Sequence, residues 1–569
     1  MNKFSPIDYV IFVIYFFVVS GYGYWVYSRK KSASTSGSHD FFLAEGSLTW
    51  WAIGASLIAS NISAEQFIGA SGQGFQVGLA VAAYEWIAAI ALIIVAVWFI
   101  PVYLKNKIFT MPQFLETRYN KSTSLIMAIF WLLLYVLVNL TSILYLGALA
   151  INSISGGDHL HAIIIGLAIF SLAIALGGMK VIGFTDVIQV LVLVVGGLAT
   201  TYIALTLVSE HFGLGKDALA GFSAMMKDSP DHFKMMLSKP GPNSSQADID
   251  KYLLLPGIGM YFAGQWIVNL NYWGCNQYIT QRALGANLKT ARTGILFAGL
   301  MKLAMPIIVI LPGIAAYVLY KNGGLHAEMT AGGHLNPDNS YSAVLGFLPN
   351  GLRGLSIAAL TAAIVASLAG KANSISTIFT MDIYKKYIKK DADEKTMVSM
   401  GKIIIALALF ISIVLTWKDL LGIGGEGGFT FIQKYTGYIS PGIFAIFILG
   451  FFWKRTTSAG AITGIIMGFL MSVLFNDFAP QLFGHETFLY TSYHTIVKGK
   501  AVYEIPFLIC MGLSFLFTMI SIIAVSFAGP KINPKHFVLD KSMFKVEPST
   551  LALIVVTLFL LAALYVKFW

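Results

Sequence analysis

The 569-residue chain has very few cysteines and few charged residues, and each shortage excludes a class of protein. Its two cysteines, Cys275 and Cys510, lie in apolar runs, which offer neither a disulfide framework nor a zinc-binding spacing. Charged residues make up only 11% of the chain, whereas 57% of the residues are hydrophobic. A soluble protein of this size could not keep so much apolar surface from water. We therefore expect an integral membrane protein.

Sequence signals for secretion and for catalysis are also missing. No A-x-A-type cleavage site follows the first apolar run, so we expect a retained helix there. The glycine-rich stretch 422–428 follows a predicted membrane helix rather than a strand, and Gly370-Lys371 lacks the context of a phosphate loop. Because no catalytic constellation gathers at one membrane face, we expect the protein not to be an enzyme.

Apolar stretches long enough to cross a bilayer recur along the whole chain. They show no strand-like alternation, and only helices or closed barrels span membranes, so we expect an all-α membrane protein. The sequence predicts about fourteen transmembrane helices, at residues 8–28, 50–72, 78–104, 123–152, 161–178, 181–208, 254–279, 291–320, 354–384, 397–416, 429–452, 457–476, 505–528 and 549–568.

Basic residues concentrate in the loops that follow odd-numbered spans, for example Arg29-Lys30-Lys31, Lys385-Lys386 and Lys454-Arg455. Cytoplasmic loops carry such an excess, so both termini are predicted to lie outside a plasma membrane, and we expect a bacterial inner membrane. The net charge of +11 is then a topology signal, and we expect no nucleic-acid partner.

Small and polar residues interrupt two of the spans, 50–72 and 254–279. The first contains Ser56, Ser60, Asn61, Ser63 and Gln66, and the second contains Pro256, Gly257, Gly259, Gly264 and Asn269. Interruptions five spans apart predict an inverted five-plus-five repeat with its binding site at mid-membrane, although close packing by small residues is an alternative. In span 457–476 the glycines at 460, 464 and 468 have no polar partner, so we expect a packing face there.

Polar side chains inside the membrane are candidates for binding residues, because burying them there is costly. Glu85 and Lys302 together offer an acceptor and a donor, which suits a neutral polyol, since hydroxyls both give and accept hydrogen bonds. The alternative is a buried structural pair. The amides Asn61, Gln66, Asn269 and Gln433 and the aromatics Tyr272 and Trp273 complete a candidate sugar pocket. We expect Asn139 only to make an interhelical hydrogen bond.

A sodium site requires oxygen ligands, and carbonyl groups freed at a helix break can provide them. Span 50–72 offers the carbonyls of Ala59 and Ile62. Span 354–384 offers the Ala363 carbonyl and the Ser367 hydroxyl. A small serine that merely packs helices is the alternative interpretation of Ser367.

The chain resembles the sodium/glucose cotransporter family of solute–sodium symporters over nearly its whole length, from about residue 8 to residue 568. The resemblance is carried by seven stretches in order: Gly54–Gly69 (GASLIASNISAEQFIG), Tyr84-Glu85-Trp86, Thr185–Gln189, Asn269–Arg282 (NLNYWGCNQYITQR), Pro312–Val318, Ser374–Tyr384 and Gln433–Gly442 (QKYTGYISPG). Several long motifs in sequence are far more specific than one short pattern.

This resemblance implies an inverted-repeat transporter core with broken helices. It also implies that a sugar of the galactose or glucose type is held by Asn61, Gln66, Glu85, Asn269, Lys302 and Gln433. Tyr272, beside Trp273, would stack on the sugar from the inner side, and Tyr84 and Phe429 would close the outer side. Sodium would bind the carbonyls of Ala59, Ile62 and Ala363 and the hydroxyl of Ser367, and it would leave past Asp186.

The sequence departs from the family pattern near the sodium site. Ala366 replaces one of two adjacent serines, which removes a ligand, and Ala369 lacks the hydroxyl used by members that carry a second sodium. One sodium per sugar is therefore expected. Lys371 is unusual at its position, and we hypothesise that it pairs with Asp186; the alternative is that it snorkels to the inner surface.

The sequence thus predicts five regions: an extra helix and loop (1–49), a first repeat (50–208), an external loop (209–253), a second repeat (254–452) and three further helices (453–569). The expected function is sodium-coupled import of a neutral sugar by alternating access within the lipid bilayer. Myo-inositol or another polyol, with sodium or proton coupling, is an alternative. A membrane sugar sensor or a channel is an alternative of another class.

Overall fold

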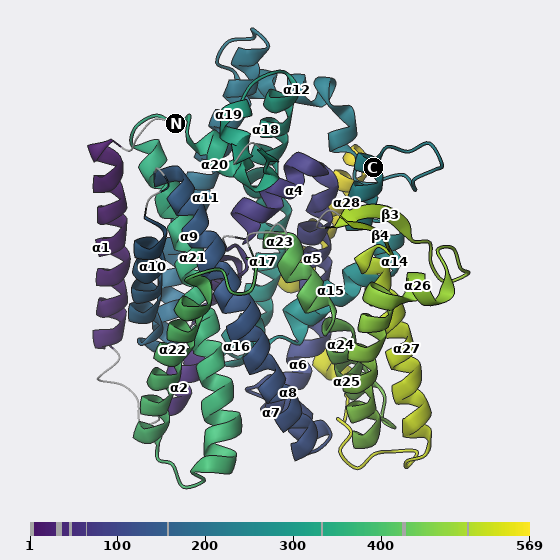
Figure 1. Cartoon of the computed structure of the whole chain (residues 1–569). Helices are drawn as coiled ribbons and strands as arrows, with labels where there is room; N and C mark the ends of the chain where they lie inside the picture. The colour runs from purple at the N-terminus through teal and green to yellow at the C-terminus, as the bar shows by residue number, and fades with distance from the viewer. Residues whose placement is uncertain are drawn as a thin grey trace. The chain divides into compact units, whose positions relative to one another are not determined.

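A computed structural model of the protein describes residues 5–29, 37–44, 48–63, 65–155, 157, 159–331, 334–423, 428–497 and 500–569. It is built from helices, as the composition predicts (Figure 1). The chain divides into two compact units, each assembled from three separate segments. The first unit comprises Met1–Ala82, Ala128–Phe233 and Gln281–Ile432, and the second comprises Ala83–Met127, Lys234–Thr280 and Gln433–Trp569.

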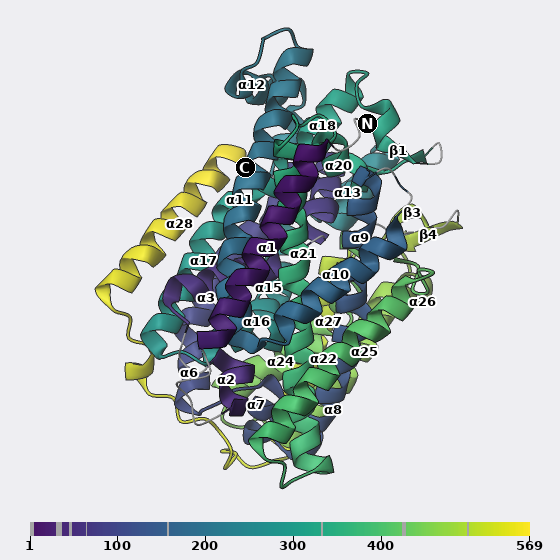
Figure 2. The same cartoon turned by 90° about the vertical axis from the view of Figure 1, so that its left-hand side faces the viewer.

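The helices of the first unit include a long central pair, α11 and α21, which pack against each other. Its main helices are α1 (Pro6–Arg29), α2 (Gly37–Leu43), α3 (Trp50–Asn61), α4 (Ser71–Gln76), α9 (Thr141–Ser155), α10 (Leu160–Ala175), α11 (Gly178–His211), α12 (Ala218–Asp228), α17 (Leu288–Val309), α18 (Leu311–Lys321), α20 (Ser340–Leu345), α21 (Leu352–Thr377) and α22 (Glu394–Thr416). Figure 2 shows α1 lying across α11 and α21, on which it packs.

The second unit contains the C-terminal helices and the segments that pack with them. Its main helices are α5 (Ala83–Ile94), α6 (Ile100–Lys105), α7 (Met111–Arg118), α13 (Gln246–Leu254), α14 (Gly259–Phe262), α15 (Gly264–Gly274), α24 (Ser440–Phe452), α25 (Ser458–Val473), α26 (Ala479–Phe483), α27 (Phe507–Phe527) and α28 (Pro548–Phe568). Three more helices, α8 (Lys121–Leu133), α16 (Gln277–Leu284) and α23 (Gly428–Gly437), contribute residues to both units.

Ten helices among the described residues are long and apolar enough to cross a membrane, and there are eleven if one bent pair is a single span. The predicted number of fourteen is therefore not confirmed. The other three predicted spans fall on shorter pieces: the interrupted stretch 50–72, the apolar helix α10, and α24 with the preceding α23. The mean hydropathy of a segment shows that it is apolar, but it does not show where its helix stops.

Strands occur only in loops within the described part of the chain. β1 (Thr330–Ala331) pairs with β2 (His334–Leu335), and β3 (Tyr493–Val497) pairs antiparallel with β4 (Lys500–Glu504). Both hairpins lie between predicted membrane spans, the first between 291–320 and 354–384 and the second between 457–476 and 505–528. The predicted all-α membrane-spanning architecture is therefore confirmed.

A buried arginine fixes the end of α24 in the second unit. Arg118 donates from Nε to the Gly450 carbonyl (2.8 Å), from Nη1 to that of Thr456 (3.1 Å) and from Nη2 to that of Trp453 (3.0 Å). The last carbonyls of a helix have no partner within it. One guanidinium therefore provides hydrogen bonds to carbonyl groups at and just beyond the helix end, which would be costly to bury without partners.

Candidate functional site

The span around residues 50–72 is broken, as its small and polar residues predict. Helix α3 stops at Asn61, Ile62 has an extended conformation with ψ 97°, and a π-helical segment begins at Glu65. The Ile62 N–H donates to the Ile58 carbonyl (2.9 Å), and the carbonyl groups that follow lie beyond the helical ladder. Backbone oxygens are thus presented within a buried stretch of the chain.

Glycines allow α3 to approach α17 closely. A Cβ on Gly54 would lie 2.9 Å from the Gly294 carbonyl oxygen, and a Cβ on Gly294 would lie 2.7 Å from that of Trp50. Only residues without a side chain allow this approach, which brings the end of α3 beside α17.

The Asn61 side chain contacts the predicted sugar-binding lysine. Lys302 of α17 donates from Nζ to Oδ1 of Asn61, and both side chains are buried. An ammonium has three donors, of which Asn61 accepts one, and the Asn61 amide carries N–H donors of its own, so the pair gathers several hydrogen-bonding groups at one point. The structure thus brings together two of the predicted sugar contacts from distant parts of the sequence.

One of the predicted sodium ligands, Ser367, contacts the same helix end. The Ser367 hydroxyl of α21 donates to the Ser60 carbonyl (3.0 Å), and Ser60 follows Ala59 directly. Ala59, Ile62 and Ala363 are all buried. The Ser63 hydroxyl is buried too and has no hydrogen-bond partner among the described residues. Sequence reasoning named neither the Ser60 carbonyl nor the Ser63 hydroxyl, although both stand in the interrupted stretch that it singled out.

The second interruption, in span 254–279, is also present. The segment Gln246–Phe262 and helix α15 are bent by 80° relative to each other at Ala263, and α15 ends at Gly274, three residues before α16 begins. The Tyr103 hydroxyl donates to the Gly274 carbonyl (2.6 Å) and Asn271 donates to the Ser440 hydroxyl (3.1 Å). Side chains of α6 and α24 thus meet polar groups near the C-terminal end of α15.

Helices α5 and α15, which pack together, carry most of the predicted sugar contacts of the second unit. Glu85, Asn269 and Trp273 are buried, and Asn269 donates to the Gln265 carbonyl (3.0 Å) of its own helix. The rings of Tyr272 and Trp273 are nearly perpendicular, with centroids 5.2 Å apart. Both aromatic residues and Asn269 therefore belong to a helix that packs against the helix carrying Glu85.

The remaining predicted sugar contacts and gates that the structure describes differ in how far they are buried. Gln66, at the start of the π-helical segment, is buried in the first unit, and Gln433 is half-buried in the second. Tyr84 of α5 is buried, next to Glu85 in sequence. The side chain of Phe429 lies outside the described residues.

Asp186 belongs to a buried cluster that the sequence did not reveal. Ser56 of α3 donates from its hydroxyl to Asp186 of α11, and Arg282 donates from Nε to the Ser56 hydroxyl (2.8 Å). Arg282 Nη2 lies 3.9 Å from the same Asp186 oxygen, and neither side chain is exposed. Sequence reasoning identified Asp186 but not Arg282, which it named only as the last residue of the family stretch Asn269–Arg282.

The hypothesis that Lys371 pairs with Asp186 is wrong. Lys371 donates instead to Oδ1 of Asn139 (3.2 Å), while Arg282 takes the carboxylate of Asp186. Lys371 is buried, so it does not snorkel to a surface either. The interhelical hydrogen bond predicted for Asn139 is confirmed. The rotation of a helix about its axis decides whether a lysine on it meets Asn139 or Asp186, and a single sequence does not determine that rotation.

Comparison with known proteins places these features in a family. The model of the sodium:solute symporter family matches residues 41–468. The chain is 43% identical to a sodium/glucose cotransporter of Vibrio parahaemolyticus, covering 99% of this chain and 98% of that protein. It is 33% identical to a mouse sodium/myo-inositol cotransporter 2, covering 83% of this chain and 70% of that protein.

A solved structure supports the same fold. It is that of a Na⁺-coupled sialic acid symporter in a substrate-bound outward-open state, which matches with a TM-score of 0.75 at 20% identity. The match covers 93% of this chain and all of that one. Together with the sequence matches, the two broken helices and their buried polar partners lead to one conclusion: this chain belongs to the sodium:solute symporter family, whose members are transporters rather than enzymes.

Proposed function

We propose that this protein imports a neutral sugar together with sodium by alternating access, with one sodium per sugar. The observation that carries the proposal is the end of α3. Ser60 contacts the predicted sodium ligand Ser367, and the next residue, Asn61, contacts the predicted sugar ligand Lys302. Coupling requires that each ligand favours one conformation of the protein. Sodium and sugar can meet this requirement if both bind at the end of α3, because the binding of either one then stabilises the same backbone conformation.

The proposed sites keep the residues identified from the sequence. The sugar site comprises Asn61, Gln66, Glu85, Asn269, Lys302, Gln433, Tyr272 and Trp273, with Tyr84, Phe429 and Tyr272 as gates. The sodium site comprises the carbonyls of Ala59, Ile62 and Ala363 and the Ser367 hydroxyl. The repeats are assigned to residues 50–208 and 254–452, and both termini to the outside of a bacterial inner membrane.

Release of sodium is proposed to pass Asp186. Its carboxylate is shared between the Ser56 hydroxyl and Arg282. Ser56 lies on the helix whose end holds the sodium ligands, so a change at that end reaches the cluster through α3. Arg282 competes with a passing cation for the carboxylate, which keeps the cation from remaining there.

The coupling energies are sufficient for accumulation. One charge that moves through about 100 mV contributes roughly 2.3 kcal/mol. A tenfold sodium gradient adds about 1.4 kcal/mol, so together the two concentrate a sugar roughly several hundredfold.

Counterflow in proteoliposomes tests the proposal directly. Vesicles that contain the purified protein are loaded with one sugar and challenged with a panel of labelled sugars, with and without sodium. We expect saturable exchange of a hexose that requires sodium, and accumulation against a gradient when sodium is higher outside. Exchange that is independent of sodium, at every pH tested, would contradict sodium coupling.

A second substrate, myo-inositol, is supported by the relatives named sodium/myo-inositol cotransporter 2. It presents the same alternation of donors and acceptors to Lys302 and Asn61 as a hexose does. Competition in the same vesicles separates the two. We expect glucose or galactose to inhibit uptake at lower concentration than myo-inositol, and the reverse order would assign the polyol.

A further inference from the structure

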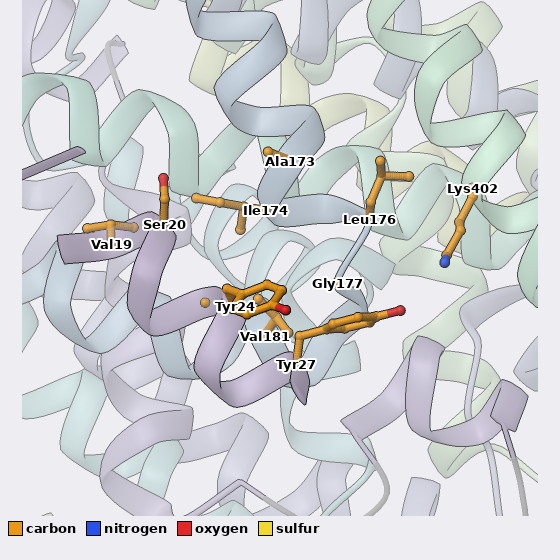
Figure 3. A pocket seen from close by; sticks show the side chains of 11 residues that line it. Val19, Ser20, Tyr24, Tyr27, Ala173, Ile174, Leu176, Gly177, Val181 and Lys402 are labelled. Atoms are coloured by element: carbon orange, nitrogen blue, oxygen red, sulfur yellow. The ribbon is translucent and has the colours of Figure 1, made fainter. Parts of the chain in front are cut away.

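A cleft of about 310 Å³ in the first unit lies apart from the proposed transport site. It is bounded by the C-terminal half of α1, the end of α10, the start of α11, and α22. Its lining includes Ser20, Tyr24 and Tyr27 from α1, Ile174 from α10, Val181 from α11 and Lys402 from α22. Figure 3 shows the Tyr27 hydroxyl directed towards the side of the cleft from which Lys402 comes.

The packing of α1 explains why the cleft opens at one end of this helix. Near its start, Asp8 accepts hydrogen bonds from the N–H groups of Gly351 (2.8 Å) and Gly354 (2.9 Å), which join α1 to the beginning of α21. Further along, Gly23 lies close to Val181 of α11. The helix is therefore held against α11 and α21, and the cleft lies beside its C-terminal half, next to the end of α10 and to α22.

The lining has the chemistry of an amphipathic ligand. Most of its surface is apolar, contributed by residues such as Ile174 and Val181. Lys402 is half-buried at its edge and forms no ion pair or hydrogen bond with any residue that the structure describes. An ammonium in such a place attracts an anionic group, and a hydrocarbon chain packs favourably against the apolar walls. A soluble phosphate would leave these walls uncovered, and a neutral hydrophobe would leave the charge without a partner.

The depth of the cleft matches the inner leaflet. The distribution of basic residues places the end of α1, the turn between α10 and α11, and the start of α22 on the cytoplasmic side. Lys402 is eight residues into α22, which corresponds to about 12 Å along the helix, and a lysine there reaches the headgroups with its stem along apolar surface. The sequence that follows Tyr27 continues with Arg29-Lys30-Lys31.

We propose that this cleft binds an anionic glycerophospholipid of the cytoplasmic leaflet. One acyl chain lies between α1 and α10, and the phosphate contacts the Lys402 ammonium and the Tyr27 hydroxyl. The proposal depends on the predicted orientation of the chain in the membrane but not on the identity of the transported solute.

The test uses the purified full-length protein in nanodiscs that contain phosphatidylglycerol as a minor component in phosphatidylcholine. Retained lipid is measured by native mass spectrometry after transfer to detergent. We expect phosphatidylglycerol to be retained preferentially. Lys402→Gln should weaken this retention roughly fivefold, which corresponds to about 1 kcal/mol for one basic residue near the surface. Lys402→Arg should preserve it.

The matched control is Lys395→Gln, an exposed lysine in the first turn of the same helix and outside the cleft. It should leave retention unchanged, and equal thermal stability of both variants shows that each is folded. Ala173→Phe, which fills the cleft without changing charge, should also displace the lipid. If Lys402→Gln and Lys395→Gln retain the same phosphatidylglycerol, or if phosphatidylcholine is retained equally, the proposal is wrong.

Discussion

Helices α3 and α25 are both rich in small residues, yet only α3 combines close packing with a break that frees buried polar groups. In α25 a Cβ on Gly464 would lie 2.5 Å from Ile522 of α27, and Gly468 faces Gly442 of α24. This confirms the packing face expected there. In α3 Gly54 packs just as closely on α17, but the helix then breaks, and Ser60 and Asn61 meet Ser367 and Lys302.

The difference shows what turns a packing helix into a binding helix. Small residues let two backbones approach in either case. In α25 the helix runs unbroken through all three glycines, so the contact that they make is steric. In α3 the break frees carbonyl groups where the neighbouring helices present a hydroxyl and an ammonium. Polar partners at a break, rather than glycine itself, indicate a site.

The largest effect is expected from disrupting the polar cluster on α3. Arg282→Met leaves the Asp186 carboxylate buried without its cation, which should lower the free energy of unfolding by about 3–5 kcal/mol. Unfolding by sodium dodecyl sulfate in mixed micelles measures it. The double variant Arg282→Met/Asp186→Leu should recover most of the loss, because no charge remains. A single variant as stable as the parent would show that the pair has no energetic role.

The next effect tests α25 as a purely steric face. Gly464→Val forces a side chain against Ile522 and Ile446, and should lower the free energy of unfolding by about 1–3 kcal/mol. The sodium concentration for half-maximal uptake should not change. Ile466→Val, on the exposed side of the same helix, is the control and should have little effect. A changed sodium dependence would break the distinction between the two helices.

Ser367→Ala tests the sodium site at the end of α3. Loss of the hydroxyl should raise the sodium concentration for half-maximal uptake about tenfold, equivalent to about 1.4 kcal/mol. Ser367→Thr keeps the hydroxyl and should restore most of the affinity. Flux measurements across sodium concentrations, at saturating sugar, give both values. If alanine leaves the curve in place, Ser367 only packs α21 against α3.

The smallest effect is expected at Ser63. Its buried hydroxyl has no partner among the described residues, so Ser63→Ala should change the free energy of unfolding by less than about 1 kcal/mol. The shift in sodium dependence should be in the same direction as for Ser367→Ala but smaller. An unchanged sodium curve would remove Ser63 from the proposed site and limit the comparison to Ser60 and Asn61.

The sequence predicted the two breaks well because each leaves a local mark. Serines and asparagine inside an apolar run, or a proline followed by glycines, signal where a membrane helix cannot continue. The sequence also predicted a sodium site between spans 50–72 and 354–384, and the structure shows one contact there, from the Ser367 hydroxyl to the Ser60 carbonyl. The four ligands themselves stay a prediction.

The errors concern relations between helices. Lys371 meets Asn139 and not Asp186, and Arg282, which the sequence analysis assigned to no site, is part of a buried cluster. Such pairings depend on how each helix is rotated about its axis, and a rotation of one residue turns a side chain by about 100°. The number of spans was equally difficult, because α10 is apolar but short.

Arg118 has a consequence for how the second unit responds to disturbance. A helix end usually frays one residue at a time, each step breaking one weak bond. The end of α24 is different, since the carbonyls of Gly450, Trp453 and Thr456 share one planar guanidinium. Moving the arginine removes its hydrogen bonds to all three carbonyls at once. Hydrogen exchange should therefore show no gradual loosening of this terminus, and its amides should exchange together, at the rate at which α7 itself comes loose.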